Sequence, residues 1–315
     1  MQGFSFGEAL SAGLRIIARH PLAVPVWTGL YLLLVGLPTI AILAHTLPAA
    51  IANYQQIAQH AGRPDPARMM ALRSQTFGWQ PVLWLLQVIA HTLIMAAVFR
   101  SVLEPREGRW AFLRLGMREL WLGLTYVVLL VATFIMVFLL VLPLVIASAI
   151  MAGVAHDSGG SVAGGAVLVA LFGFVGLGVI VWVLLRLCLA LPMTFAERRF
   201  MLYESWDLTR GHAFKMFLVY LVLAIGVVLF ELAVVAVAGV TLIPQLRAMA
   251  AGAASAATVG DTLRAALDVI HRQAPILATL VIVVSLLAMA IQTILLAPLV
   301  EIYRELTGAP ETAAA

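Results

Sequence analysis

The chain has 315 residues, of which 63% are hydrophobic and only 11% are charged, and its mean hydropathy is +1.06. A water-soluble globule of this size needs more polar side chains to cover its surface, so the composition excludes this class and indicates a polytopic membrane protein. The net charge of +4 does not indicate nucleic-acid binding, because membrane proteins carry excess Arg and Lys on their cytoplasmic flanks. The single cysteine, Cys188, excludes an intramolecular disulfide framework and a cysteine-based metal site.

Six apolar stretches are long enough to cross the hydrocarbon core of a bilayer, which takes about 20 helical residues. They predict an all-α membrane domain, residues 1–306, and a disordered tail, 307–315. The first stretch follows a basic segment, as a signal peptide does, but its length of about 24 residues favours an uncleaved span. The predicted spans are 22–45, 80–102, 119–151, 162–191, 215–243 and 276–303.

The distribution of basic residues predicts the orientation of these spans. If the N-terminus is inside, only six of the 19 basic residues lie outside: Arg63, Arg68, Arg73, Arg247, Arg264 and Arg272. This bias predicts a multi-pass protein of a bacterial cytoplasmic (inner) membrane with both termini in the cytoplasm. The two long outer joints, 46–79 and 244–275, are expected to form surface helices over the outer mouth.

A segment with a helical amphipathic pattern precedes each pair of spans on the inner side. In the first segment, the positions Phe6, Leu10, Leu14 and Ile17 form an apolar stripe opposite polar residues. The second runs from 106 to 118. Helices of this kind lie in the plane of the membrane surface, so we expect amphipathic interfacial helices on the cytoplasmic side.

The third such segment carries the clearest sequence signals. Pro192 is expected to end the fourth span, and Thr194 with Glu197 forms a capping box that predicts the start of a new helix. Gly211 predicts its end. Three copies of a surface helix followed by a hairpin suggest a threefold repeat; the alternative is that the inner joints of any small membrane protein look alike.

Several polar residues fall at membrane depth. Glu231 lies about 24 Å from Lys215 at the helical rise of 1.5 Å per residue, near the midplane of the fifth span. His91, with Gln87 one turn before it, and Gln292 reach a similar depth. The four residues are a candidate substrate or proton site, because intramembrane ionisable groups usually face a bundle interior or a water cavity. The alternative is a protonated Glu231 that bonds a neighbouring helix, and both interpretations place it away from lipid.

A second polar group lies at the inner ends of the spans. It comprises Arg100, Glu104, Arg186 and Glu301. Arg186 and Glu301 are expected to pair across two helices. We interpret this group as structural, since such pairs fasten span ends and Arg reaches the membrane surface readily.

The stretch from Arg186 to Lys215 contains Arg, Pro and an acidic residue followed by Ser-Trp-x-Leu-Thr-x-Gly. The positions are Arg186, Pro192, Glu197, Ser205, Trp206, Thr209 and Gly211. This succession resembles the membrane domain of bacterial glycerophosphoryl diester phosphodiesterases. Those enzymes carry a separate barrel domain with metal-binding acidic residues, and this chain ends just after its sixth span. The resemblance therefore implies a stand-alone inner-membrane protein of this kind, without transfer of the hydrolytic activity.

Catalytic motifs such as His-Glu-x-x-His, the phosphate-binding Gly-x-x-x-x-Gly-Lys loop and Gly-x-Ser-x-Gly do not occur. We therefore expect a non-enzymatic scaffold or accessory protein in envelope or lipid organisation, with no cofactor and no metal. Its expected partners are membrane lipids and an unidentified membrane protein or a second copy. The alternative is a small transporter or channel that uses Glu231 and His91. A lipid-acting enzyme ranks third, since it needs a catalytic cluster.

Overall fold

The computed structural model describes residues 4–46, 48, 67, 70, 74, 77–105, 109–158, 163–255 and 259–308. These residues form helices joined by turns, with no strand among them. Six of the helices are long and apolar enough to cross a membrane, which confirms the predicted all-α fold with six spans. They are Ala23–Thr46, Gln80–Leu103, Met117–Gly153, Gly165–Glu197, Ala213–Ala236 and Ala278–Thr307.

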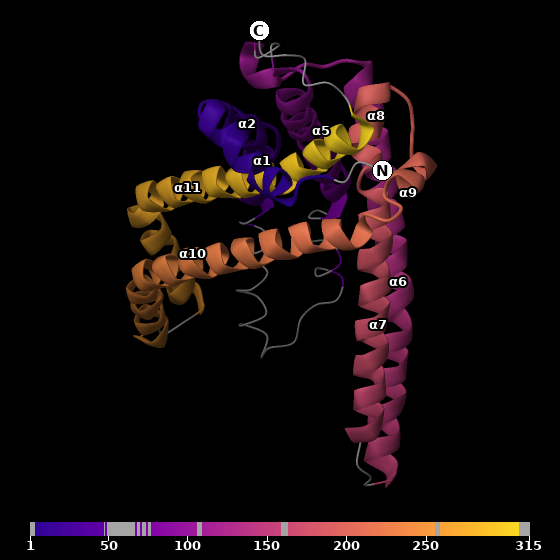
Figure 1. Ribbon diagram of the computed structural model, residues 1–315. Coiled ribbons are helices and arrows are strands. Elements are labelled where there is room, and N and C mark those ends of the chain that lie inside the picture. Colours follow the sequence, from indigo (N-terminus) through magenta and orange to yellow (C-terminus); the bar gives the residue numbers. More distant parts are fainter. Residues whose placement is uncertain are drawn as a thin grey trace.

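Long helices, with a few short helices and helical turns, account for most of the described chain. In order they are α1 (Phe6–Arg19), α2 (Ala23–Tyr31), the π-helical turn η1 (Leu32–Gly36), α5 (Gln80–Leu103), the 3-10 turn η3 (Arg109–Phe112), α6 (Met117–Ser158), α7 (Ala163–Leu187), α8 (Ala190–Glu197), α9 (Tyr203–Leu208), α10 (Ala213–Ser255) and α11 (Val259–Thr307). The first and second spans, α6 with α7, and α10 with α11 form three hairpins (Figure 1). Residues 244–255 belong to the end of α10 and residues 259–275 to the start of α11, so the described part of the joint 244–275 does not form separate surface helices. Most of 46–79 lies outside the described residues.

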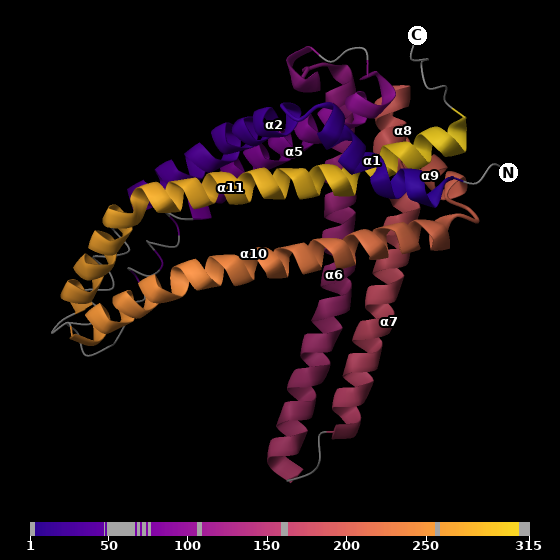
Figure 2. The same ribbon diagram turned by 60° about the vertical axis from the view of Figure 1, so that its left-hand side comes forward.

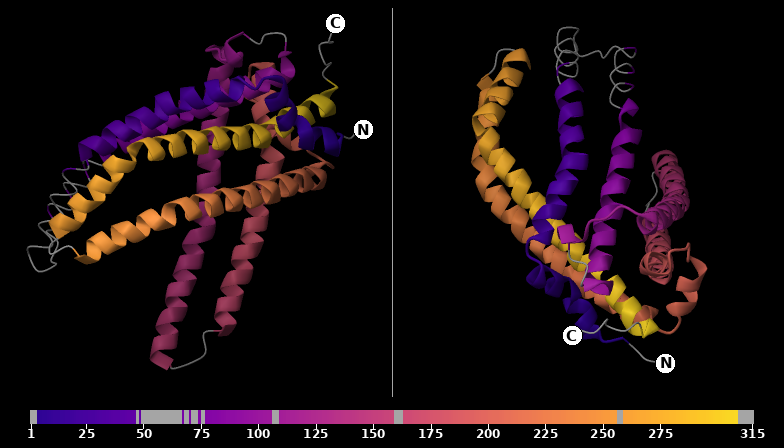
Figure 3. Two further views of the ribbon diagram at one scale, coloured as in Figure 1. Left: turned by 90° about the vertical axis from the view of Figure 1, so that its left-hand side faces the viewer. Right: turned by 90° about the horizontal axis from the view of Figure 1, so that it is seen from above.

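The chain enters and leaves each hairpin at its open end, opposite the turn, and the three open ends pack together (Figure 1). We call this region the hub; it also contains α1, α8 and α9. The α6–α7 hairpin projects away from the hub, whereas α5, α10 and α11 run in a different direction (Figures 2 and 3). Away from the hub, α6 and α7 contact chiefly each other.

Burial is concentrated in the hub. Trp27, Phe99, Phe112 and Phe195 are at most 1% exposed, and Phe99 meets Phe195 edge to face at 5.9 Å. Such large side chains contribute most of the hydrophobic stabilisation of a core. The most apolar window of α5 is 50% buried, against 6–17% for the other five spans. Helix α5 is therefore the central helix, and most of the remaining span surface is uncovered.

The first predicted surface segment is the helix α1, capped by Ser5, whose Oγ accepts a hydrogen bond from the Glu8 amide at 3.5 Å. Its buried face differs from the predicted stripe: Ala9, Ala12, Gly13 and Ile16 are buried, and Leu14 is 59% exposed. The small residues Ala9, Ala12 and Gly13 allow α1 to pack closely on α11. The apolar stripe lies beside this contact, and its position in a membrane surface stays a prediction.

The prediction of a helix over 106–118 is wrong for the described part of that segment. Only the short turn η3 forms before α6 begins at Met117, and Ala111 and Phe112 have positive φ angles of 52° and 63°. Two successive non-glycine residues in this region cannot continue a right-handed helix. Tertiary contacts hold them there: the Trp27 indole donates to the Ala111 carbonyl at 2.8 Å, and Arg100 donates to the Phe112 carbonyl.

The capping-box prediction at Thr194 is also wrong. Helix α8 ends at Glu197, because Arg198 adopts a left-handed φ of 58°. Pro192 lies in the first turn of α8, where its missing N–H is not needed. Thr194 is buried, and its Oγ1 accepts a hydrogen bond from the Met201 amide at 3.2 Å. A glycine does follow α9 as expected: Gly211 has a φ of 83°.

Candidate functional site

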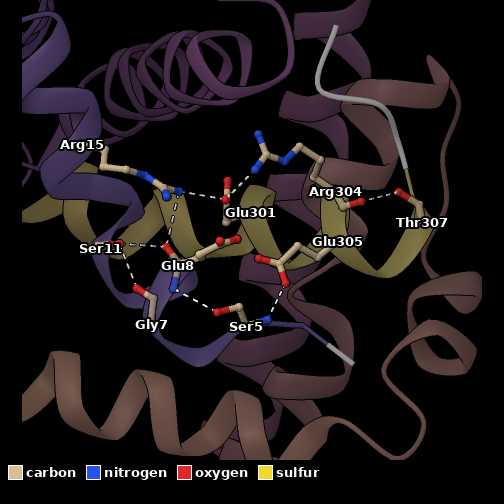
Figure 4. Close-up of polar contacts among 9 residues, drawn as sticks. All are labelled: Ser5, Gly7, Glu8, Ser11, Arg15, Glu301, Arg304, Glu305 and Thr307. Carbon is tan, nitrogen blue, oxygen red and sulfur yellow. Dashed lines mark hydrogen bonds and ion pairs between the residues drawn. The ribbon is translucent and has the colours of Figure 1, made fainter. Parts of the chain in front are cut away.

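A buried carboxylate ties α1 to α11 in the hub (Figure 4). Glu301 is 1% exposed, and its Oε1 accepts from Arg15 at 2.8 Å and from Arg304 at 2.6 Å. A buried carboxylate is costly unless it is paired and hydrogen-bonded. The two guanidinium groups meet that requirement, so this ion-pair cluster fastens the N-terminal helix to the last span.

Two further carboxyl groups lie next to Glu301. Ligand oxygens of Glu8, Glu301 and Glu305 lie within 4.8 Å of one another, and Glu305 accepts a hydrogen bond from the Ser5 amide (Figure 4). Such oxygens suit a hard cation such as Ca²⁺. However, Arg15 and Arg304 already supply positive charge to Glu301. The arrangement therefore fits a structural link better than a metal site.

A second ionic group connects the first and second hairpins. Arg100 is 3% exposed and pairs with Glu119, which is 5% exposed. Glu104 bridges Arg100 at 3.9 Å and Arg118 at 2.5 Å. The Phe195 ring lies under both guanidinium groups, at 5.6 Å from Arg100 and 5.9 Å from Arg118. The expected grouping of Arg100 with Glu104 forms, and Glu119 is the partner that the sequence interpretation missed.

The predicted pair between Arg186 and Glu301 does not form, because Glu301 on α11 faces α1 and is occupied by Arg15 and Arg304. Arg186, near the C-terminal end of α7, instead lies against two indole rings that also contact each other. Its guanidinium carbon is 5.5 Å from the ring centres of both Trp182 and Trp206. Its Nη1 donates to the Trp206 carbonyl at 3.3 Å, whereas its Nε is buried without a hydrogen-bond partner.

The motif residues around Arg186 come together at the junction of α7 and α9. The Ser205 hydroxyl donates to the Arg186 carbonyl at 2.8 Å, and the Thr209 hydroxyl donates to the same carbonyl at 3.4 Å. This carbonyl is near the end of α7, where a helix leaves its last acceptors unpaired. Ser205 and Thr209 thus cap α7 and fix the backbone of Arg186. Pro192 and Glu197 lie apart, on α8.

A cavity of about 680 Å³ adjoins this junction, between α7 and the start of α10. Its walls are mainly aliphatic and aromatic, and Arg186 is the charged residue in the described lining. Trp182 and Gly211 also line it. The combination of an apolar groove with one basic side chain at its hub end is the best-defined candidate binding site in the described part of the chain.

The residues predicted at the midplane do not form one site. Glu231 is exposed on α10, beyond Leu223, the last buried residue with a described side chain on that helix. His91 is half-buried on α5 with Tyr31 and Tyr126 at ring distances of 5.6 and 6.3 Å. Its Nδ1 is 2.8 Å from the carbonyl oxygen of Gln87, whose side chain is exposed.

Gln292 is half-buried on α11. No hydrogen bond or ion pair among the described residues joins Glu231 to His91, Gln87 or Gln292. The exposed Glu231 differs from the expectation that it turns away from lipid, because the distal part of α10 has few neighbours to cover it.

The fold gathers part of the Ser-Trp-x-Leu-Thr-x-Gly motif around Arg186. Ser205, Trp206 and Thr209 contact it, and Gly211 lines the adjoining cavity. These contacts give the motif a physical role, which is to hold one arginine at the base of a groove. A comparison of the chain with protein-family models, curated proteins and solved structures finds no match.

Proposed function

We propose that this chain is a non-enzymatic multi-pass protein of a bacterial cytoplasmic membrane that acts as a scaffold or accessory protein in lipid or envelope organisation. One observation carries the proposal. The open ends of three hairpins are fastened into one ion-paired hub, while the apolar surface of most spans stays uncovered. A molecule of this form presents much of its mass to lipid acyl chains and holds its polar contacts at one end.

The transporter alternative receives no comparable support. A transport site needs polar groups that line one path through the membrane. Glu231 and His91 lie on different helices, and neither lines the Arg186 groove or the apolar groove of about 800 Å³ between Trp84 and Cys188. Neither of these grooves therefore provides a water-filled path that passes both Glu231 and His91.

The proposed topology predicts the side on which a C-terminal reporter lies. Alkaline phosphatase fused after Ala315 is expected to be inactive and green fluorescent protein to be fluorescent, because the excess of Arg and Lys keeps the open ends of the hairpins in the cytoplasm. The same pair of reporters inserted at 159–160 provides the matched control and should give the opposite result. An active phosphatase at the C-terminus would contradict the proposed cytoplasmic location of that end.

Reconstitution separates the scaffold from the transporter. In vesicles of phosphatidylethanolamine and phosphatidylglycerol, an imposed pH gradient is expected to decay as in empty vesicles, with the same rate for Glu231→Gln. Lipid order, measured with an environment-sensitive membrane dye, should change in proportion to the amount of protein. A protein-dependent decay that Glu231→Gln abolishes would replace the scaffold with proton transport.

A further inference from the structure

The groove beside Arg186 has the dimensions of one membrane leaflet. Its wall on α7 runs from Phe174 to Arg186, which is about 18 Å at the helical rise of 1.5 Å per residue. Half of a hydrocarbon core of about 30 Å is close to this length. Phe174 and Phe214 are 77% and 73% exposed, so the groove is open along its side. Its volume of about 680 Å³ lies within the range typical of ligand sites.

The hub end of the groove is electropositive. Arg186 has a buried Nε without a hydrogen-bond partner, and no carboxylate of the described residues forms an ion pair with it. The first turn of α10 lines the same end through Ala213 and Phe214. The first N–H groups of a helix lack intrahelical acceptors and attract anions. Two independent sources of positive potential therefore meet where the apolar groove ends.

The aromatic residues fit the same position in a bilayer. Trp182 and Trp206 both contact the Arg186 guanidinium, and their rings meet edge to face at 5.1 Å. Tryptophan is enriched at the level of lipid head groups, where its ring is apolar and its N–H is polar. The pair also limits the rotation of the guanidinium, so that Arg186 loses less conformational entropy when it binds an anion.

We propose that this groove binds one anionic phospholipid, with its phosphate on Arg186 and an acyl chain along α7 and α10. The inference rests on the proposed lipid-facing role and names the lipid class and the site. The larger groove lined by Trp84 and Cys188 has no charged residue in its described lining, so it is expected to take acyl chains without selecting the head group. Charge, and not volume, is thus what distinguishes the Arg186 groove.

Native mass spectrometry of the detergent-purified chain tests the site, with phosphatidylglycerol and phosphatidylcholine of identical acyl chains as probes. We expect one phosphatidylglycerol to be retained in preference to phosphatidylcholine. Arg186→Gln should weaken this binding about tenfold, or about 1.4 kcal/mol, because it removes the charge-assisted hydrogen bonds to the phosphate. Arg186→Lys should retain most of the preference, since the charge remains.

A second variant fills the groove without altering Arg186. Gly178 lines the groove, and a Cβ at this position meets no atom within 4 Å, so Gly178→Phe is expected to fold normally and to weaken phosphatidylglycerol binding at least fivefold. Gly226→Phe is the matched control: that Cβ also meets nothing within 4 Å, and Gly226 is not in the groove lining. This control should bind as the unmodified chain does.

Three results would overturn the proposal: equal retention of the two lipids, unchanged binding by both Arg186→Gln and Gly178→Phe, or displacement of the lipid by excess inorganic phosphate alone. The last result would indicate an anion site that does not use the acyl chain. If Arg186→Gln fails to fold, phosphatidylglycerol binding by Gly178→Phe still tests the proposal. Failure here leaves the scaffold proposal standing, because the flux and lipid-order measurements test that role separately.

Discussion

Replacement of Arg100 by Leu is expected to lower the free energy of unfolding by about 3–5 kcal/mol, the range for breaking a buried ion pair by removal of one partner. The variant leaves the Glu119 carboxylate, which is 5% exposed, in the core without its counter-ion. It also removes the donor to the Phe112 carbonyl. Equilibrium unfolding in detergent micelles with a rising fraction of sodium dodecyl sulfate measures the loss.

The double variant Arg100→Leu with Glu119→Leu isolates the cause. Because it removes both buried charges, it should recover at least half of the lost stability. Arg118→Gln is the matched control in the same ionic group: Arg118 and Glu104 side chains are 25% and 30% exposed, so its cost should stay below about 1 kcal/mol. A double variant no more stable than Arg100→Leu alone would show that the uncompensated Glu119 charge is not the cause.

Replacement of Gly13 by Leu is expected to detach α1 from α11. A Cβ at Gly13 would overlap with the Ile294 Cα, which is a backbone atom and cannot rotate away. Overpacking a close contact costs about 1–3 kcal/mol even when the structure relaxes, and a whole Leu side chain exceeds what this contact can absorb. Loss of α1 also removes Arg15 from the buried Glu301. Faster limited proteolysis within α1 in detergent reports the detachment.

Gly7→Leu provides the control for Gly13→Leu in the same helix. A Cβ at Gly7 meets no atom within 4 Å, so this variant changes the helix composition equally without touching α11. It should resist protease as the unmodified chain does. Equal sensitivity of the two variants would mean that the close approach of α1 to α11 does not stabilise the hub.

Sequence periodicity and hydropathy predicted the spans well because a bilayer imposes a strong constraint on length and composition. The second span is predicted at 80–102 and found at Gln80–Leu103, and the first is predicted at 22–45 and found at Ala23–Thr46. A helix in lipid satisfies its own backbone, so its extent depends mainly on its own residues. The structure of the joints between spans, in contrast, depends on contacts with other parts of the chain.

The errors fall where tertiary contacts override local signals. Thr194 has the spacing of a helix start, but its hydroxyl is used inside the hub by the Met201 amide. The partner of Glu301 was sought on α7, yet it is Arg15, because the sequence does not show that α1 packs on α11. Glu119 was missed although it begins the predicted third span, because the sequence does not show that this end of α6 packs against Arg100 on α5.

The α6–α7 hairpin has a mechanical consequence. The most apolar windows of its two spans are each only 6% buried, so its orientation depends on the few contacts at its base. Membrane helices meet a change in hydrocarbon thickness by tilting, at a cost of fractions of a kcal/mol per Å. Tilting of this hairpin is expected to turn α7 relative to the first turns of α10, and so to change the width of the groove beside Arg186. We therefore expect the affinity of this groove for a phospholipid to depend on the thickness of the bilayer.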